Sequence, residues 1–276
     1  MTKVAAIQMV SSANVSENLE MAGKLIGDAV AKRSEFVTLP ENFPFMGRHE
    51  RDKFKIVEQP GTGVIQDFLA GQARRHHIWL LGGTIPVVAT DPTRLRAASL
   101  LYAPDGQCAF RYDKIHLFDV LVNEATEEYY NESATIEAGD DVTVADTEIG
   151  KIGVSVCYDL RFPELYRNML SHDVQIIVVP SAFTATTGEV HWEVLLKTRA
   201  VENLSYVVAS NQGGAHIDHR ATWGHSMIID PWGNILDCII SGEGMAIADI
   251  DLQRQEVLRK NFPVLEHRKL NYQLIK

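Results

Sequence analysis

Short apolar runs rich in Val and Ile, repeated along the whole chain, constrain the fold most strongly. Each run is bounded by Gly, Pro or polar clusters and has the length of a β-strand rather than of a buried helix. Several are apolar at every position, which is typical of strands buried on both faces. The runs cover residues 4–10, 36–39, 78–81, 98–102, 152–156, 176–179, 206–209, 226–229 and 245–250.

Helical patterns lie between some of these runs. One apolar stripe at helical spacing extends from Leu19 to Val30, with Asn14 or Ser16 as the N-cap. Further helices are expected over 64–73, 163–170 and 192–204, and turns at 103–106, 148–151 and 230–234. Strand–helix alternation dominates the first part and hairpin signals the second. The sequence therefore predicts an α/β fold, a single domain over residues 1–276, with mixed sheets covered by helices.

Charge and cysteine content exclude several classes of protein. A formal net charge of −10 over 276 residues disfavours binding to nucleic acid, and no basic stripe offsets it. No apolar stretch approaches the ~20 residues that span a bilayer, and the N-terminus resembles a strand rather than a signal peptide. Cys108, Cys157 and Cys238 form no CxxC pair, which indicates a reducing compartment. We expect a cytoplasmic protein with no nucleic-acid or membrane partner.

Three ionisable side chains each end a strand-like run: Glu41, Lys114 and Cys157. Cys157 also faces the start of a helix opened by Pro163, where free N–H groups favour a thiolate. A carboxylate can take the thiol proton, while a protonated lysine and the Tyr158 N–H can bind an oxyanion. The three residues suggest a hydrolase that forms a thioester. A lone strand-end Cys is, however, more often a small core residue.

Longer segments around these residues resemble the nitrilase superfamily of carbon–nitrogen hydrolases. Leu39-Pro-Glu-Asn is similar to its glutamate motif, Tyr112-Asp-Lys-Ile-His to its lysine motif, and Val156-Cys-Tyr-Asp-Leu-Arg-Phe-Pro-Glu to its cysteine motif. The resemblance implies a four-layer α-β-β-α sandwich of the nitrilase type. It also implies Glu41 as general base, Lys114 as stabiliser of the tetrahedral intermediate and Cys157 as nucleophile, with no metal or organic cofactor.

The same resemblance implies a second active-site glutamate after the lysine motif. Glu132 fits this position best, because a Glu-Ser pair is followed by a segment that ends in Gly. Glu127 and Glu128 are the alternatives. The segment between Lys114 and Glu132 lacks the Pro-Gly pair of many relatives.

The second half of the chain narrows the expected substrate. Segments 180–196 and 219–233 resemble the Nit-type deaminated-glutathione amidase branch. This implies hydrolysis of the terminal amide of a small carboxylate-bearing amide, deaminated glutathione first, to acid and ammonia. The alternative is an omega-amidase acting on 2-oxoglutaramate or 2-oxosuccinamate. A nitrilase and a non-catalytic scaffold rank lower. Family resemblance also suggests a homodimer or homotetramer.

The residues that bind the substrate are less constrained by the sequence. Arg161, just past the nucleophile, is a candidate cation for the substrate carboxylate, with an ion pair to Glu164 as the alternative. Phe183 and Thr184 follow a strand end and are candidates to line the pocket, with core packing as the alternative.

Histidines raise the question of a metal site. His216, His219 and His225 cluster loosely in the sequence, but without the spacing of a zinc motif. We therefore predict no metal site. His116, two residues after Lys114, is a candidate for a hydrogen bond that supports the site.

Overall fold

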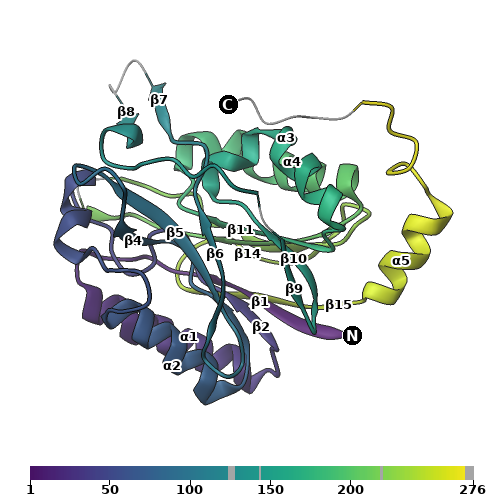
Figure 1. Cartoon of the computed structure of the whole chain (residues 1–276), viewed down its shortest axis with the longest axis horizontal. Coiled ribbons are helices and arrows are strands. Elements are labelled where there is room, and N and C mark those ends of the chain that lie inside the picture. Colours follow the sequence, from purple (N-terminus) through teal and green to yellow (C-terminus); the bar gives the residue numbers. More distant parts are fainter. Residues whose placement is uncertain (124–127, 143, 218–219, 271–276) are drawn as a thin grey trace.

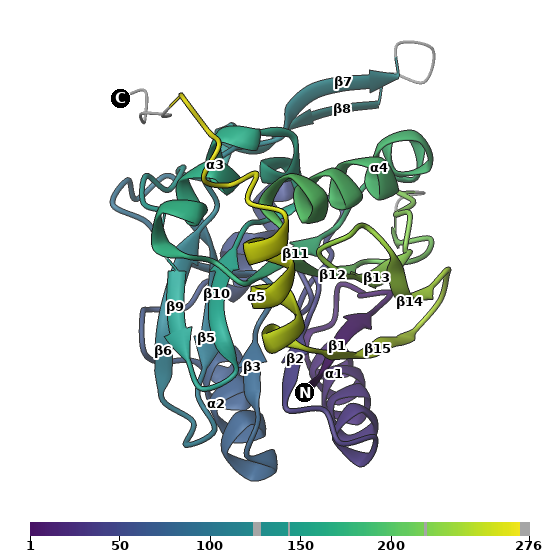
Figure 2. The same cartoon turned by 90° about the vertical axis from the view of Figure 1, so that its right-hand side faces the viewer.

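Two β-sheets lie face to face between two layers of helices (Figure 1). The structure, a computed structural model, describes residues 1–123, 128–142, 144–217 and 220–270. Figure 2 shows the same arrangement from the side on which helix α5 lies, at one end of the sheets. The predicted four-layer α-β-β-α sandwich is confirmed.

The first sheet has the strand order β15-β1-β2-β3-β5-β4, and β6 also pairs with β5. Its inner strands β1, β2 and β3 are parallel, whereas β15 and the strands from β4 to β6 pair antiparallel. The bounds are β1 Thr2–Gln8, β2 Phe36–Thr38, β3 Trp79–Leu81, β4 Ile85–Val88, β5 Leu95–Tyr102, β6 Cys108–Asp113 and β15 Gly244–Ile250.

The second sheet has the order β14-β13-β12-β11-β10-β9, with β10, β11 and β12 parallel. A separate hairpin of β7 and β8 projects beside it (Figure 1). The bounds are β7 Asp119–Asn123, β8 Glu128–Asn131, β9 Val144–Thr147, β10 Gly150–Val154, β11 Ile176–Ser181, β12 Tyr206–Asn211, β13 Ser226–Ile229 and β14 Ile235–Ile239.

Helices α1 and α2 cover the outer face of the first sheet, and α3 and α4 that of the second (Figure 1). No helix within the described ranges is long and apolar enough to cross a membrane. The α-helices are α1 Val15–Ala31, α2 Val64–His76, α3 Pro163–Met169, α4 Ala185–Asn203 and α5 Leu252–Asn261. Short 3-10 turns are η1 Glu50–Ile56, η2 Glu132–Ala134, η3 Cys157–Arg161 and η4 Leu170–His172.

Strand β1 shows why the apolar runs are continuous. Val4 and Ala6 belong to the core between the sheets, whereas Ala5 and Ile7 belong to the core beneath α1 and α2. Successive side chains of a strand point to opposite faces, so a strand covered on both faces needs apolar residues at every position.

The structure refines the predicted boundaries. Asn14 is the N-cap of α1, and its side chain accepts hydrogen bonds from the N–H groups of Ser16 and Glu17. Helix α4 begins at Ala185 rather than at 192, because the Thr184 side chain caps it earlier. Residues 123–141, where the sequence predicted neither strand nor helix, contain β8 and η2. Strand β8 depends on pairing with β7, which no local pattern reveals.

Candidate active site

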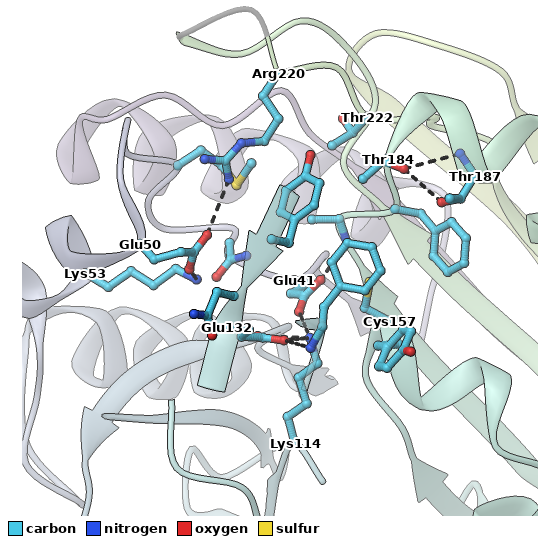
Figure 3. Close-up of a pocket in the computed structure, with 18 of the residues that line it drawn as sticks. Glu41, Glu50, Lys53, Lys114, Glu132, Cys157, Thr184, Thr187, Arg220 and Thr222 are labelled. Atoms are coloured by element: carbon cyan, nitrogen blue, oxygen red, sulfur yellow. Dashed lines mark hydrogen bonds and ion pairs between the residues drawn. The ribbon is translucent and has the colours of Figure 1, made fainter. Parts of the chain in front are cut away.

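Glu41, Lys114, Glu132 and Cys157 meet in one pocket, each just past the end of a strand (Figure 3). Glu41 follows β2 of the first sheet and Lys114 follows β6. Cys157 follows β10 of the second sheet, and Glu132 follows β8. The pocket holds about 660 Å³ of empty space, mouth included. Its other lining residues are Asn42, Met46, Glu50, Lys53, Phe118, Tyr130, Asn131, Tyr158, Arg161, Ala182, Phe183, Thr184, Thr187, Arg220 and Thr222.

Lys114 lies between two carboxylates. Its Nζ is 2.9 Å from Glu41 Oε1, and 3.0 and 2.8 Å from the two carboxylate oxygens of Glu132. The side chain is only 2% exposed. Burial lowers the pKa of Lys114, but Glu132 and Glu41 outweigh it and hold the pKa well above its usual value. Lys114 is therefore an ammonium ion at neutral pH.

Glu41 is fixed from three sides. One carboxylate oxygen faces Lys114, and the other accepts a hydrogen bond of 2.8 Å from the Ala182 N–H. Gln212 Nε2 donates to the Glu41 carbonyl at 3.1 Å. Gly83 has φ +48°, and a Cβ there would lie 2.0 Å from the Pro40 carbonyl oxygen. The backbone of Gly83 thus approaches Pro40 closely, and it supports the loop that carries the carboxylate.

Cys157 has φ +48° at the turn from β10 into η3, a backbone conformation that is uncommon for residues other than glycine. Burial and the charge of Glu41 raise the pKa of the Cys157 thiol well above its usual value, against the opposing effects of Lys114 and the Ala182 N–H. The expectation of a thiolate stabilised by a helix start is therefore wrong for the resting site. Helix α3 begins at Pro163 as predicted, but burial beside a carboxylate dominates.

Glu132 is the second glutamate in contact with Lys114. Besides the lysine contacts, its Oε2 accepts a hydrogen bond of 2.7 Å from the Phe118 N–H. Burial raises the pKa of Glu132; Lys114 opposes this rise and Glu41 adds to it. Of the two alternatives, Glu127 and the side chain of Glu128 lie outside the described residues.

Asp159 is a buried residue beside the site that sequence reasoning missed. It is fully buried and accepts hydrogen bonds from the Tyr112 hydroxyl at 2.7 Å and the Val156 N–H at 2.8 Å. It also accepts from the His116 N–H at 2.9 Å and pairs with His116 Nδ1 at 2.7 Å. Asp159 therefore joins the segment of Lys114 to the segment of Cys157. A carboxylate two residues after the cysteine was the available signal.

The four candidate substrate-binding residues, Tyr158, Arg161, Phe183 and Thr184, all line the pocket. The Arg161 guanidinium lies over the rings of Phe183 and Tyr158, at 5.2 and 5.8 Å from their centroids. Arg161 Nη1 also lies 3.2 Å from His191 Nδ1. Within the described residues, no ion pair joins Arg161 to Glu164, the alternative raised by the sequence.

Three charged residues at the pocket mouth were not predicted: Glu50, Lys53 and Arg220. Lys53 Nζ is 2.7 Å from Glu50 Oε2, and Arg220 Nη1 is 3.7 Å from Glu50 Oε1. Chiefly because of Lys53, the pKa of Glu50 falls to about 2. An i,i+3 pair such as Glu50 and Lys53 gives no signal in the sequence beyond that of a solvated helix face.

The histidines have polar or aromatic neighbours. His216 contacts the Ser11 carbonyl and the Thr222 hydroxyl, and His225 stacks on Trp223 with ring centroids 4.4 Å apart. His219 lies outside the described residues. Among residues that the structure describes, no group of three or more His, Cys, Asp or Glu side chains could hold a metal ion.

Comparison with known proteins identifies the family. The carbon-nitrogen hydrolase family model matches residues 3–260. The chain is 43% identical over 267 residues to the deaminated glutathione amidase of Synechocystis sp. (strain PCC 6803), covering 96% of this chain and 97% of that protein. It is 33% identical to omega-amidase NIT2 of Mus musculus, covering 97% of this chain and 95% of that protein.

A solved structure extends the comparison to three dimensions. The crystal structure of the Caenorhabditis elegans NitFhit protein matches with a TM-score of 0.87 at 35% identity, covering 97% of this chain and 65% of that one. Sequence match, sandwich architecture and pocket agree, and this chain belongs to the carbon–nitrogen hydrolase family.

Proposed function

We propose that the chain is an amidase in which Cys157 forms a thioester, Glu41 moves the protons and Lys114 stabilises the oxyanion. The observation that carries the proposal is the buried ammonium of Lys114, held between Glu41 and Glu132 beside the thiol. Such a site combines a nucleophile, a base and a fixed positive charge, the elements that acyl transfer requires.

In the acylation half, Glu41 takes the proton of the Cys157 thiol as sulfur attacks the amide carbon. The raised pKa of the thiol supports this step, because a neutral thiol needs a base at the moment of attack. Lys114 and the Tyr158 N–H bind the oxyanion. The C–N bond then breaks, and Glu41 returns the proton to the departing nitrogen.

In the deacylation half, Glu41 takes a proton from water as its oxygen attacks the thioester carbon. The C–S bond then breaks, Glu41 returns this proton to the sulfur of Cys157, and the acid leaves. Glu132 keeps Lys114 charged and oriented throughout. The side chains thereby supply every proton transfer and fixed charge of the proposed reaction, so it requires no metal or organic cofactor.

Deaminated glutathione is the proposed substrate, because the 43% identical relative bears that activity in its name. 2-Oxoglutaramate is the second candidate, supported by the relative named omega-amidase. Deaminated glutathione contains only secondary amides, so its hydrolysis releases an amine, and the expected ammonia applies to 2-oxoglutaramate alone. In both compounds the amide that is cleaved joins nitrogen to a 2-oxoglutaryl group. Both therefore give the same 2-oxoglutaryl thioester with Cys157. The two candidates therefore differ only in the leaving group.

Arg161 is the proposed cation for the carboxylate of the acyl half. Its guanidinium lies in the pocket wall that carries the nucleophile, packed on the Phe183 and Tyr158 rings. The two rings hold the guanidinium in the pocket wall, where its N–H donors can bind a carboxylate. Phe183 and Thr184 then shape the wall around the acyl chain.

We also infer that residues 1–276 form one catalytic domain that assembles as a homodimer or homotetramer in the cytoplasm. Exposed valines along one side of α4, Val190, Val194 and Val201, support an apolar contact between subunits. The free cysteines support a reducing compartment.

The proposed function is tested by measuring kcat/KM for both substrates through their common acid product, with Cys157→Ala as the control. We expect turnover of deaminated glutathione by the wild type and none by the variant. A tenfold preference for either substrate corresponds to ~1.4 kcal/mol in transition-state binding and assigns the activity. A wild type that matches Cys157→Ala on both substrates would overturn the proposal.

A further inference from the structure

The pocket mouth carries a second group of charges that the proposed mechanism does not use. We call Glu50, Lys53 and Arg220 the mouth cluster. Glu50 and Lys53 lie on η1, whereas Arg220 comes from the chain between β12 and β13. Figure 3 shows the three side chains together on one side of the pocket, with Glu41 and Glu132 between them and Cys157.

The mouth cluster contains two cations and one carboxylate. Its only carboxylate, Glu50, is ionised at neutral pH because its pKa is about 2. Lys53 is 13% exposed, and among the described residues Glu50 takes one of its three N–H donors, at 2.7 Å. The charge acts inside the pocket, since Lys53 contributes to lowering the pKa of Glu132 against the larger effect of burial. Such a site favours an anionic group.

The place of the mouth cluster indicates which part of a substrate it meets. Arg161 lies on the wall that bears Cys157, packed on Tyr158, and is the proposed partner of the acyl half. The acyl chain and the leaving amine extend in different directions from the carbon that sulfur attacks. The mouth cluster lies on the other side of Glu41 and Glu132 from Cys157, and it is therefore positioned for the leaving amine.

Resting on the proposed amidase function, we propose that the mouth cluster binds a carboxylate on the leaving group. The preferred substrate is then an amide whose amine half is a small carboxylate-bearing molecule such as a dipeptide. Glu50 holds Lys53 and Arg220 near each other, and the incoming carboxylate accepts hydrogen bonds from the other N–H donors of Lys53. This contact makes such a substrate preferred over a primary amide, whose leaving group is only ammonia.

The chemistry restricts this effect to one half-reaction. In acylation the C–S bond forms, the C–N bond breaks, and the thiol proton passes through Glu41 to the nitrogen of the carboxylate-bearing amine. The amine then departs. The thioester that remains is the same for a primary amide with the same acyl group. The mouth cluster should therefore change the rate of acylation and leave thioester hydrolysis unaffected.

The test compares three substrates with one acyl group: a dipeptide amide ending in a carboxylate, the same compound ending in a carboxamide, and the primary amide. The wild type should favour the carboxylate over the carboxamide by about tenfold or more in kcat/KM, as expected for a charge-assisted contact. Lys53→Met, which keeps the length of the side chain, should bring this ratio close to one. Its kcat/KM for the carboxamide and for the primary amide should change by the same factor, because neither leaving group carries the carboxylate that Lys53 binds.

Lys55→Met is the matched control. Lys55 lies on the same turn and pairs with Asp52 at 2.7 Å, but its side chain is 73% exposed and outside the pocket. It should keep the wild-type ratio. Arg220→Gln should lower the ratio as Lys53→Met does. With two variants, the test does not depend on the folding of either one alone.

An unchanged ratio in both mouth-cluster variants, or equal losses on all three substrates, would refute the leaving-group site and leave the amidase function intact. A wild type that hydrolyses none of the three, like Cys157→Ala, would instead refute the proposed function itself.

Discussion

Replacing Glu132 with Gln tests the arrangement of charges around Lys114. The change removes one of two carboxylates while preserving the shape of the side chain. Among the residues that the structure describes, Glu41 is then the ionic partner that Lys114 keeps, at 2.9 Å. A closer pair between Glu41 and Lys114 holds the Glu41 carboxylate away from the thiol and the ammonium away from the oxyanion. Both halves of the reaction should therefore slow.

The size of the effect follows from the distance. At an effective dielectric constant of about 20, unit charges at the 2.8 Å between Lys114 Nζ and Glu132 Oε2 attract each other by about 6 kcal/mol. A Gln oxygen can still accept a hydrogen bond, but a neutral acceptor is roughly half as strong as a charged one. A loss of about 3 kcal/mol corresponds to a fall of about 10²-fold in kcat/KM.

The assay is steady-state hydrolysis of the preferred amide, with thermal unfolding to show that the variant folds. Glu137→Gln is the matched control. Glu137 pairs with Arg96 outside the pocket and lies on the same segment, so activity should stay within about twofold of wild type. A folded Glu132→Gln enzyme with wild-type kinetics would refute the assigned role of Glu132.

Three further predictions concern the nucleophile, the base and the buried tie between motifs. Cys157→Ala should fold normally but show no acyl adduct by intact mass, and Glu41→Gln should likewise accumulate none; a full adduct in Glu41→Gln would contradict its role as base. The raised pKa keeps the Cys157 thiol protonated, so its thiolate absorbance, measured as wild type minus Cys157→Ala, should appear only above a pH of ~8.5, the ordinary cysteine pKa. A thiolate signal at neutral pH would count against the burial argument. Asp159→Asn should reduce the free energy of unfolding by about 1–3 kcal/mol in urea titrations, because donors such as the His116 N–H lose a charged acceptor; unchanged stability would show that this tie contributes little.

Local patterns in the sequence predicted most of the architecture. The apolar runs became strands and the stripe from Leu19 to Val30 became α1, because side-chain periodicity is a property of neighbouring residues. The hairpin of β7 and β8 was missed, and helix α4 was predicted to begin too late. Both errors occurred where pairing between strands or a capping side chain decides the boundary.

The sequence alone determined which residues could carry the chemistry, since Glu41, Lys114 and Cys157 lie in segments whose residue types are themselves distinctive. Only the tertiary structure decided how those residues behave. The protonated thiol, the tie through Asp159 and the charged mouth of the pocket arise from burial and Coulomb forces between segments far apart in the chain. These forces depend on distances through space, which the order of residues does not contain.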